Sequence, residues 1–212
     1  MLGLSIPELI TNAITLIIAI SVHEFAHAYV ADQLGDPLPR SQGRLTLDPR
    51  SHLDPIGSLM MVFIGFGWGR PVLTNPYNYR LPIRTGMAIV AAAGPFSNFI
   101  LAMLAAIPFR LRWISSTTFA NGVSFLPSFP DFLWTFIWLN IGLMLFNLIP
   151  IAPLDGFKVA LGVLPDEWAN KLATLEQFGP ILLMVLLVAG RGILGLLLGP
   201  VQITIFSLLL GR

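Results

Sequence analysis

Long apolar runs recur along the whole chain and are separated by short polar stretches. A transmembrane helix needs about 20 mainly apolar residues to cross the hydrocarbon core of a bilayer. Five runs are candidates for such helices, at about residues 7–32, 85–108, 132–148, 175–189 and 193–210. The pattern therefore predicts an all-α polytopic membrane protein with about five transmembrane helices.

The first and last predicted helices differ in how clearly their ends are marked. Pro7 fits a first helical turn, and the Gly-Asp-Pro string at residues 35–37 ends the first helix. Near the other end, the Gly-Arg-Gly string at residues 190–192 resembles a turn, and two later glycines and Pro200 weaken the last helix. The last helix is therefore expected to begin either near residue 193 or only after Pro200.

The connection from Gly35 to Arg84 contains a further apolar stretch that is too short and too rich in glycine to span a bilayer. Residues 65–78 within it are expected to form a short membrane-dipping β-hairpin or re-entrant loop. Irregular backbone is tolerated at membrane depth only where protein or a water-filled cavity covers it. The connection is therefore predicted to dip partly into the membrane.

The composition supports a membrane protein and excludes several other classes. Of the 212 residues, 55% are hydrophobic and only 11% are charged, against about 25% charged in an ordinary soluble domain. The chain has no cysteine, which excludes disulfides, thiolate metal sites and a cysteine nucleophile. The net charge of +1 gives no reason to expect a nucleic acid partner. The first residues lack the positive segment of a cleavable signal, so none is expected.

The positive charges are divided unevenly between the two sides that five spans define. Of the 12 Lys and Arg residues, nine fall on the side reached after the first span and three on the opposite side. The positive-inside rule places the richer side in the cytoplasm. The N-terminus is then outside, the C-terminus is cytoplasmic, and residues 23–27 lie nearer the cytoplasmic face.

Residues 23–27, in the first predicted helix, read His-Glu-Phe-Ala-His. His23 and His27 lie one helical turn apart on the same face. This spacing suits two imidazole ligands of one Zn²⁺ ion, with Glu24 beside them as a general base. Ionisable side chains at membrane depth are costly unless they have a partner and a function. The pattern therefore indicates a zinc protease site inside the bilayer.

A catalytic zinc ion usually has three protein ligands, which leaves one position for water. The third histidine, His52, lies in a Ser-His-Leu-Asp-Pro string that is typical of a turn, so a local structural role is favoured. Asp155 is the stronger candidate, because it follows Pro150 and Pro153 on the same side of the membrane as the histidine pair. Broken backbone there needs a water-filled or protein-lined cavity. A merely solvated carboxylate is the alternative for Asp155.

Three motifs together resemble those of the site-2 proteases, a family of intramembrane zinc metalloproteases. They are His-Glu-Phe-Ala-His at residues 23–27, Gly-Pro-Phe-Ser-Asn at residues 94–98, and the set Asn147, Pro150, Pro153, Asp155 and Gly156. Residues 43–49 and 52–57 also resemble compact prokaryotic members of the family. The resemblance covers about residues 8–165.

The resemblance implies one membrane-embedded protease domain over residues 1–212, in the compact form without a PDZ or CBS domain. Its catalytic core would be residues 8–165, followed by C-terminal helices at 175–211. It implies that His23, His27 and Asp155 bind one Zn²⁺ and that Glu24 activates the attacking water. Asn147 would hold the substrate backbone or the developing oxyanion, with a helix cap or an interhelical hydrogen bond as the alternative.

Other polar or small residues in the spans have two interpretations each. Gly94 is expected to permit close helix packing, while Asn98 either joins helices or lies near the site. Asn140 faces either a neighbouring helix or the cavity.

An exposed strand edge within residues 65–78 would pair with an unwound substrate, whereas a packed loop would have no such role.

The function implied is an intramembrane zinc endopeptidase that cleaves transmembrane segments of membrane proteins, in regulated intramembrane proteolysis. Compactness and resemblance together favour the inner membrane of a prokaryotic cell. Gating of the substrate would come from the spans, the hairpin or a regulatory membrane partner. A membrane metal transporter and a zinc-binding scaffold without turnover remain alternatives. A transporter would require more acidic positions along several spans than the chain offers.

Overall fold

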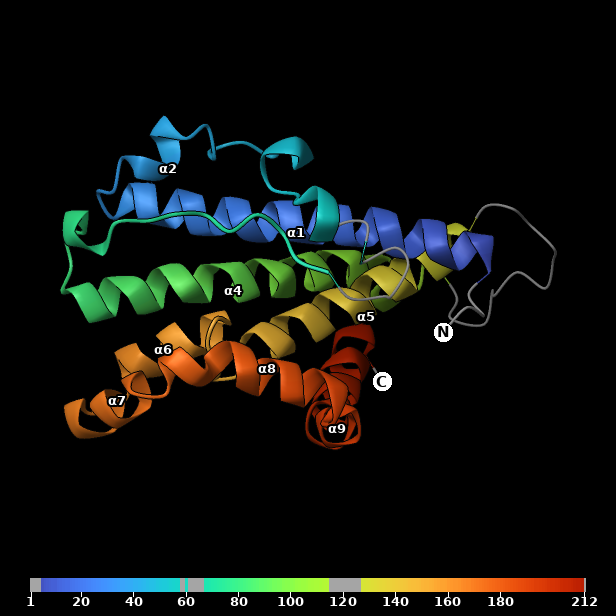
Figure 1. The fold of residues 1–212 in the computed structure, drawn as a ribbon. Helices are drawn as coiled ribbons and strands as arrows, with labels where there is room; N and C mark the ends of the chain where they lie inside the picture. Colours follow the sequence, from blue (N-terminus) through green and yellow to red (C-terminus); the bar gives the residue numbers. More distant parts are fainter. Residues whose placement is uncertain (1–4, 58–59, 61–66, 115–126, 212) are drawn as a thin grey trace.

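The computed structural model describes all residues except 1–4, 58–59, 61–66, 115–126 and 212 (Figure 1). The α-helices are α1 (Ile6–Gln33), α2 (Leu38–Ser41), α4 (Ile83–Arg110), α5 (Phe129–Asn147), α6 (Asp155–Val163), α7 (Asp166–Ala173), α8 (Gly179–Val188) and α9 (Arg191–Leu210). Three short 3₁₀ helices are η1 (Pro49–Ser51), η2 (Pro76–Asn78) and η3 (Glu176–Phe178). The described residues contain no strand, so the all-α prediction is confirmed for them.

Among the described residues, five helical segments are long and apolar enough to cross a membrane, as the sequence predicted. They are Ile6–Gln33, Ile83–Arg110, Phe129–Asn147, Asp166–Val188 and Gly192–Leu210. The fourth differs from the predicted helix at 175–189, because it is assembled from α7, η3 and α8.

The helix α1 is defined by local chemistry at both ends. Ser5 and Glu8 form a capping box at its start, which pairs backbone N–H groups that the first turn leaves without partners. Just after its end, Gly35 has a φ of 109°, a left-handed conformation that favours glycine. A Cβ atom on Gly35 would also lie 2.9 Å from the Asn78 carbonyl oxygen. The turn therefore needs glycine there.

The helix α4 lies at the centre of the bundle and packs against α1, α5 and α6 (Figure 1). The helix α9 packs against α5 and α4. The largest apolar core joins α4, α5 and α9 and consists of Ala102, Ala106, Phe109, Leu133, Ile137, Ile141, Met144, Phe206 and Leu210. This core fixes the three helices relative to one another and leaves the face of α4 near Gly94 for α1.

The connection between α1 and α4 returns along α1 (Figure 1). Its extended segment, residues 67–75, is joined to the preceding loop by a single antiparallel bridge between Leu53 and Gly69. The predicted hairpin at 65–78 begins in residues that lie outside the described part of the chain. Within residues 67–78 the backbone is extended and then forms η2, so a hairpin is not seen there.

The helix α9 runs without interruption through Pro200. Of the two starts that the sequence left open, the structure has the earlier one. Proline removes one backbone hydrogen bond, but uncoiling an apolar segment would expose many more polar groups to lipid. The continuous helix is therefore the less costly arrangement.

Candidate metal centre

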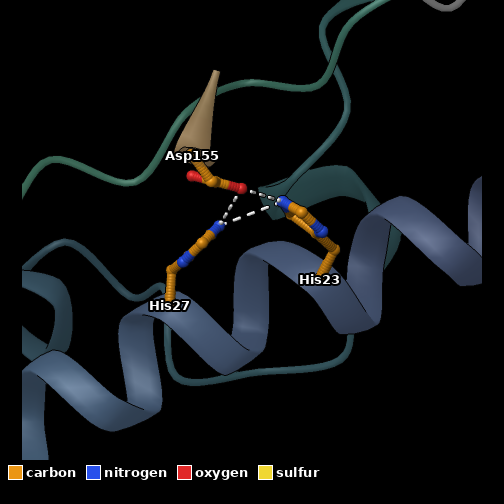
Figure 2. Close-up of side chains that lie close together, drawn as sticks. All are labelled: His23, His27 and Asp155. Carbon is orange, nitrogen blue, oxygen red and sulfur yellow. Dashed lines mark hydrogen bonds and ion pairs between the residues drawn. The ribbon is translucent and has the colours of Figure 1, made fainter. Parts of the chain in front are cut away.

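His23 and His27 project from one face of α1 toward Asp155, the first residue of α6 (Figure 2). The two Nε2 atoms are 3.0 Å apart. The Asp155 Oδ2 atom lies 3.1 Å from Nε2 of His23 and 3.3 Å from Nε2 of His27. The structure thus brings together the three residues that the sequence proposed as ligands.

A tight turn places Asp155 beside the histidines. The chain leaves α5 at Asn147 and re-enters a helix at Asp155 after seven intervening residues. A Cβ atom on Gly156 would lie 2.2 Å from the Leu148 carbonyl oxygen. Only glycine permits this approach, which explains the Asp-Gly pair at the start of α6.

Gly94 of α4 lies directly against the two imidazoles. A Cβ atom there would be 2.3 Å from Nε2 of His27 and 2.6 Å from Nε2 of His23. The sequence suggested close packing of helices at Gly94. The structure shows that the imidazole rings of the candidate metal site pack directly against Gly94.

Hydrogen bonds to acceptors on α4 define which nitrogen of each imidazole ring carries the proton. The Nδ1 atom of His23 is 2.8 Å from Oδ1 of Asn98, and Nδ1 of His27 is 2.7 Å from the Val90 carbonyl oxygen. Carbonyl oxygens only accept hydrogen bonds, so each neutral ring carries its proton on Nδ1. Both Nε2 atoms therefore present lone pairs to each other and to Asp155.

Three acceptor atoms facing one another repel unless a cation lies among them. The Oδ2 atom of Asp155 is buried and receives no hydrogen bond. Zn–N and Zn–O distances near 2.0–2.1 Å in a tetrahedral site imply ligand atoms about 3.3 Å apart, close to the separations found here. Imidazoles that donate through their second nitrogen are typical of zinc ligands. The donor set and its spacing fit a zinc ion with an open fourth position.

Glu24 lies beside this site and contacts the extended segment 67–75. Its Oε2 atom accepts a hydrogen bond from the Val72 backbone N–H, at 3.0 Å. The side chain is partly exposed and lines two cavities. A carboxylate in this position can receive a proton from a water molecule next to the metal ligands.

The two cavities meet at the candidate metal site and differ in character. One, of about 270 Å³, has a lining of mixed polar and apolar character that includes Thr74, Tyr79 and Lys158. The other, of about 390 Å³, has a mainly apolar lining that includes Trp68 and Phe146. Both are also lined by His23, Glu24 and Asn147. The site is therefore bordered by one cavity of mixed polarity and by one that is mainly apolar.

Asn147 is the last residue of α5, and its side-chain amide donates to the Leu143 carbonyl oxygen at 3.0 Å. This bond lies within α5 and is not the interhelical hydrogen bond that the sequence offered as an alternative. The same side chain lines both cavities, so its position also suits contact with a substrate.

His52 is not part of the site. It is fully buried, and its Nε2 atom hydrogen-bonds with the Thr46 carbonyl oxygen at 2.6 Å. Burial lowers the pKa of this imidazole, which favours the neutral ring. His52 thus supports the loop, in agreement with the interpretation that its turn sequence favoured.

Two groups at the site could not be found from the sequence. The Val90 carbonyl oxygen and the Val72 N–H are backbone atoms, which every non-proline residue has. The identity of the side chains of Val90 and Val72 therefore does not indicate these backbone contacts. Asn98 and Asn140 were recognised as candidates, and the structure places Asn98 next to His23.

The fold and the site define a membrane protein that is all-helical over its described residues and that carries a His₂-carboxylate group able to hold a metal ion. No family model matches the chain, and no solved structure does. The chain is 39% identical over 179 residues to "Putative zinc metalloprotease YwhC" of Bacillus subtilis, which covers 84% of this chain and 80% of that protein. It is 34% identical over 181 residues to "Putative zinc metalloprotease Rip2" of Mycobacterium tuberculosis, covering 82% of this chain and 64% of that one.

The chain belongs to the same family as these proteins, which are members of the site-2 protease family. It spans less than two thirds of Rip2. The relationship supports a zinc metalloprotease function and agrees with the metal site that the geometry defines.

Proposed function

We propose that this protein is an intramembrane zinc endopeptidase that cleaves transmembrane segments of other membrane proteins. The observation that carries the proposal is the convergence of His23, His27 and Asp155 beside Glu24, in a protein whose described residues include five helical segments long and apolar enough to span a membrane. The domain would be the compact form of the family, in a prokaryotic inner membrane, with its site nearer the cytoplasmic face.

His23, His27 and Asp155 would hold the zinc ion. The chemistry that zinc supplies in such a site is to polarise the scissile carbonyl and to lower the pKa of a water molecule to about 7. Glu24 takes a proton from the attacking water, whose oxygen bonds to the carbonyl carbon. The peptide C–N bond then breaks, and Glu24 passes the proton to the departing nitrogen. The Asn147 amide would hold the substrate backbone or the oxyanion.

The two cavities support a substrate that is apolar at one end and more polar at the other. The mainly apolar cavity suits the side chains of a transmembrane segment, and the cavity of mixed polarity, with Lys158, suits the residues that continue the substrate outside the lipid. Glu24 and Asn147 line both. A scissile bond between the two cavities would lie where an apolar helix has unwound toward the membrane surface.

The decisive experiment compares wild type with Glu24→Gln for zinc content and for cleavage of single-span model substrates in liposomes. Both proteins should hold about one zinc ion, because Glu24 is not among the ligands, and only wild type should cleave. Bound zinc without cleavage by wild type would contradict the protease assignment, and ion flux would then test a transporter. Absence of zinc from both would contradict the ligand assignment.

A further inference from the structure

The side-chain amide of Asn98 is held in one orientation by acceptors on two other helices. Its Nδ2 atom donates to the Ala19 carbonyl oxygen of α1 at 3.2 Å and to Oδ1 of Asn140 on α5 at 3.0 Å. Because both acceptors lie on the nitrogen side, the Oδ1 atom is directed to His23. Asn98 is fully buried, so water does not compete for these bonds.

Asn140 is itself fixed by its own helix. Its Nδ2 atom donates to the Phe136 carbonyl oxygen at 2.9 Å, which turns its Oδ1 atom toward Asn98. Asn140 is also fully buried. The result is a chain of hydrogen bonds in one direction, from Nδ1 of His23 to Asn98, from Asn98 to Asn140, and from Asn140 to Phe136.

Reversal of the Asn98 amide would change the chemistry of His23. An NH₂ group facing Nδ1 would require that atom to accept, so a neutral ring would carry its proton on Nε2. That Nε2–H would point at His27 and Asp155, and a protonated nitrogen cannot bind a metal ion. The reversed amide would also set its oxygen against the oxygens of Ala19 and Asn140, which is unfavourable in a buried site.

We propose that Asn98 and Asn140 are positioning residues that hold His23 in the tautomer and orientation needed to bind zinc. Asn140 does so without touching a ligand, by fixing the amide of Asn98. This inference rests on the proposed zinc site and assigns both asparagines to it. It makes α5, which supplies no ligand, a determinant of metal affinity at α1.

The test measures zinc affinity of the full chain in detergent by competition with a chelator. Asn98→Leu removes the acceptor for His23 at similar volume and should weaken zinc binding by about 10- to 100-fold, as loss of such partners does. Asn140→Leu should weaken it less, because the Ala19 carbonyl still holds one amide hydrogen. Absorption of the Co²⁺-loaded proteins should change in the same order, since those bands report ligand geometry.

Conservative variants separate positioning from packing. When its buried carboxyl group is protonated, Asn98→Asp keeps a carbonyl acceptor for His23 and an O–H donor on the side of the Ala19 and Asn140 oxygens. In the same form, Asn140→Asp keeps an acceptor for Asn98. Both should therefore bind zinc far better than the leucine variants. Ser97→Ala is the matched control, because that neighbouring hydroxyl bonds only within α4, to the Gly94 carbonyl oxygen. Its zinc affinity should equal that of wild type.

The outcomes are distinguishable from failure of the proposed function. If wild type binds zinc and both leucine variants bind it equally well, the positioning role is wrong. The role is also wrong if the aspartate and leucine variants weaken binding equally. Thermal unfolding of each metal-free protein shows whether that variant folds. If Asn98→Leu does not fold, the zinc affinity of Asn140→Leu still tests the positioning role. A wild type without zinc would instead contradict the metal site.

Discussion

Each imidazole of the histidine pair is held by an oxygen atom from α4 rather than from its own helix. Asn98 supplies one oxygen and the Val90 backbone supplies the other. Between these two residues lies Gly94, whose missing side chain lets α4 approach the rings. At the residue scale, the candidate metal site is therefore shaped by a helix that contributes none of its candidate ligands.

Gly94→Ala is predicted to damage the metal site while leaving α4 helical. Alanine normally favours a helix over glycine by about 1 kcal/mol. Here its methyl group would lie 2.3 Å from Nε2 of His27, so α4 or the rings must move. We expect zinc affinity to fall at least about 10-fold, as when ligand geometry is disturbed, with helix content unchanged by circular dichroism.

The matched control is Gly195→Ala in α9, where a new Cβ atom meets nothing within 4 Å. That variant should bind zinc as wild type does. Normal zinc binding by Gly94→Ala would show that α1 and α4 are not as close at the site as described.

At the scale of elements, the extended segment 67–75 is held near both ends and contacts Glu24 between them. Near one end, the Arg70 N–H donates to the His52 carbonyl oxygen at 2.7 Å. At the other, the Asn75 N–H donates to Oδ2 of Asp36 at 2.6 Å. Its position beside Glu24 thus depends on His52 and Asp36, neither of which is a candidate metal ligand.

Asp36→Ala is predicted to loosen this segment. Asp36 is fully buried and accepts bonds from the backbone of Leu38 and Asn75 and from the side chain of Asn78. Leaving these donors unpaired should lower the free energy of unfolding by about 1–3 kcal/mol. Hydrogen exchange should increase at Val72 and Asn75.

Glu167→Ala serves as the control for Asp36→Ala. The Glu167 side chain is exposed and lies 2.7 Å from the exposed Lys171 four residues on, a pair worth little in water. Equal exchange rates in the segment for both variants would contradict the role of Asp36 as an anchor.

At the scale of the whole molecule, the candidate ligands join distant parts of the chain. His23 and His27 belong to α1, whereas Asp155 begins α6 after two further helices, α4 and α5, have crossed the bundle. An ion held by all three would bind the folded protein and not the unfolded chain. Metal binding and folding stability are therefore expected to be coupled.

Removal of zinc by a chelator is predicted to lower thermal stability in detergent. A ligand present at 100 times its Kd stabilises the folded state by about 2.7 kcal/mol. The unfolding temperature should fall on chelation and recover when zinc is restored. In His27→Ala, which lacks one ligand, the chelator should cause a much smaller shift. An equal shift in both proteins would place the stabilising metal elsewhere.

Local sequence was enough to predict the spans and most of the candidate site. The histidine pair follows from helical periodicity, because residues four apart share a face. Asp155 was favoured over His52 because Pro150 and Pro153 break the chain just before it, and the structure indeed places Asp155 with the histidines. The tautomer and orientation of the histidine rings could not be predicted. They depend on contacts of His27 with Val90 and of His23 with Asn98, which are 63 and 75 residues apart in sequence.

Apolar length and helical periodicity are local properties, so they alone predict a helical membrane protein that carries a His-Glu-x-x-His helix. Packing between helices was needed to bring Asp155 to the histidines, to place Gly94 against them, and to orient their rings through Asn98 and Val90. These outcomes depend on contacts between segments distant in sequence, and neither periodicity nor composition encodes which atoms meet there.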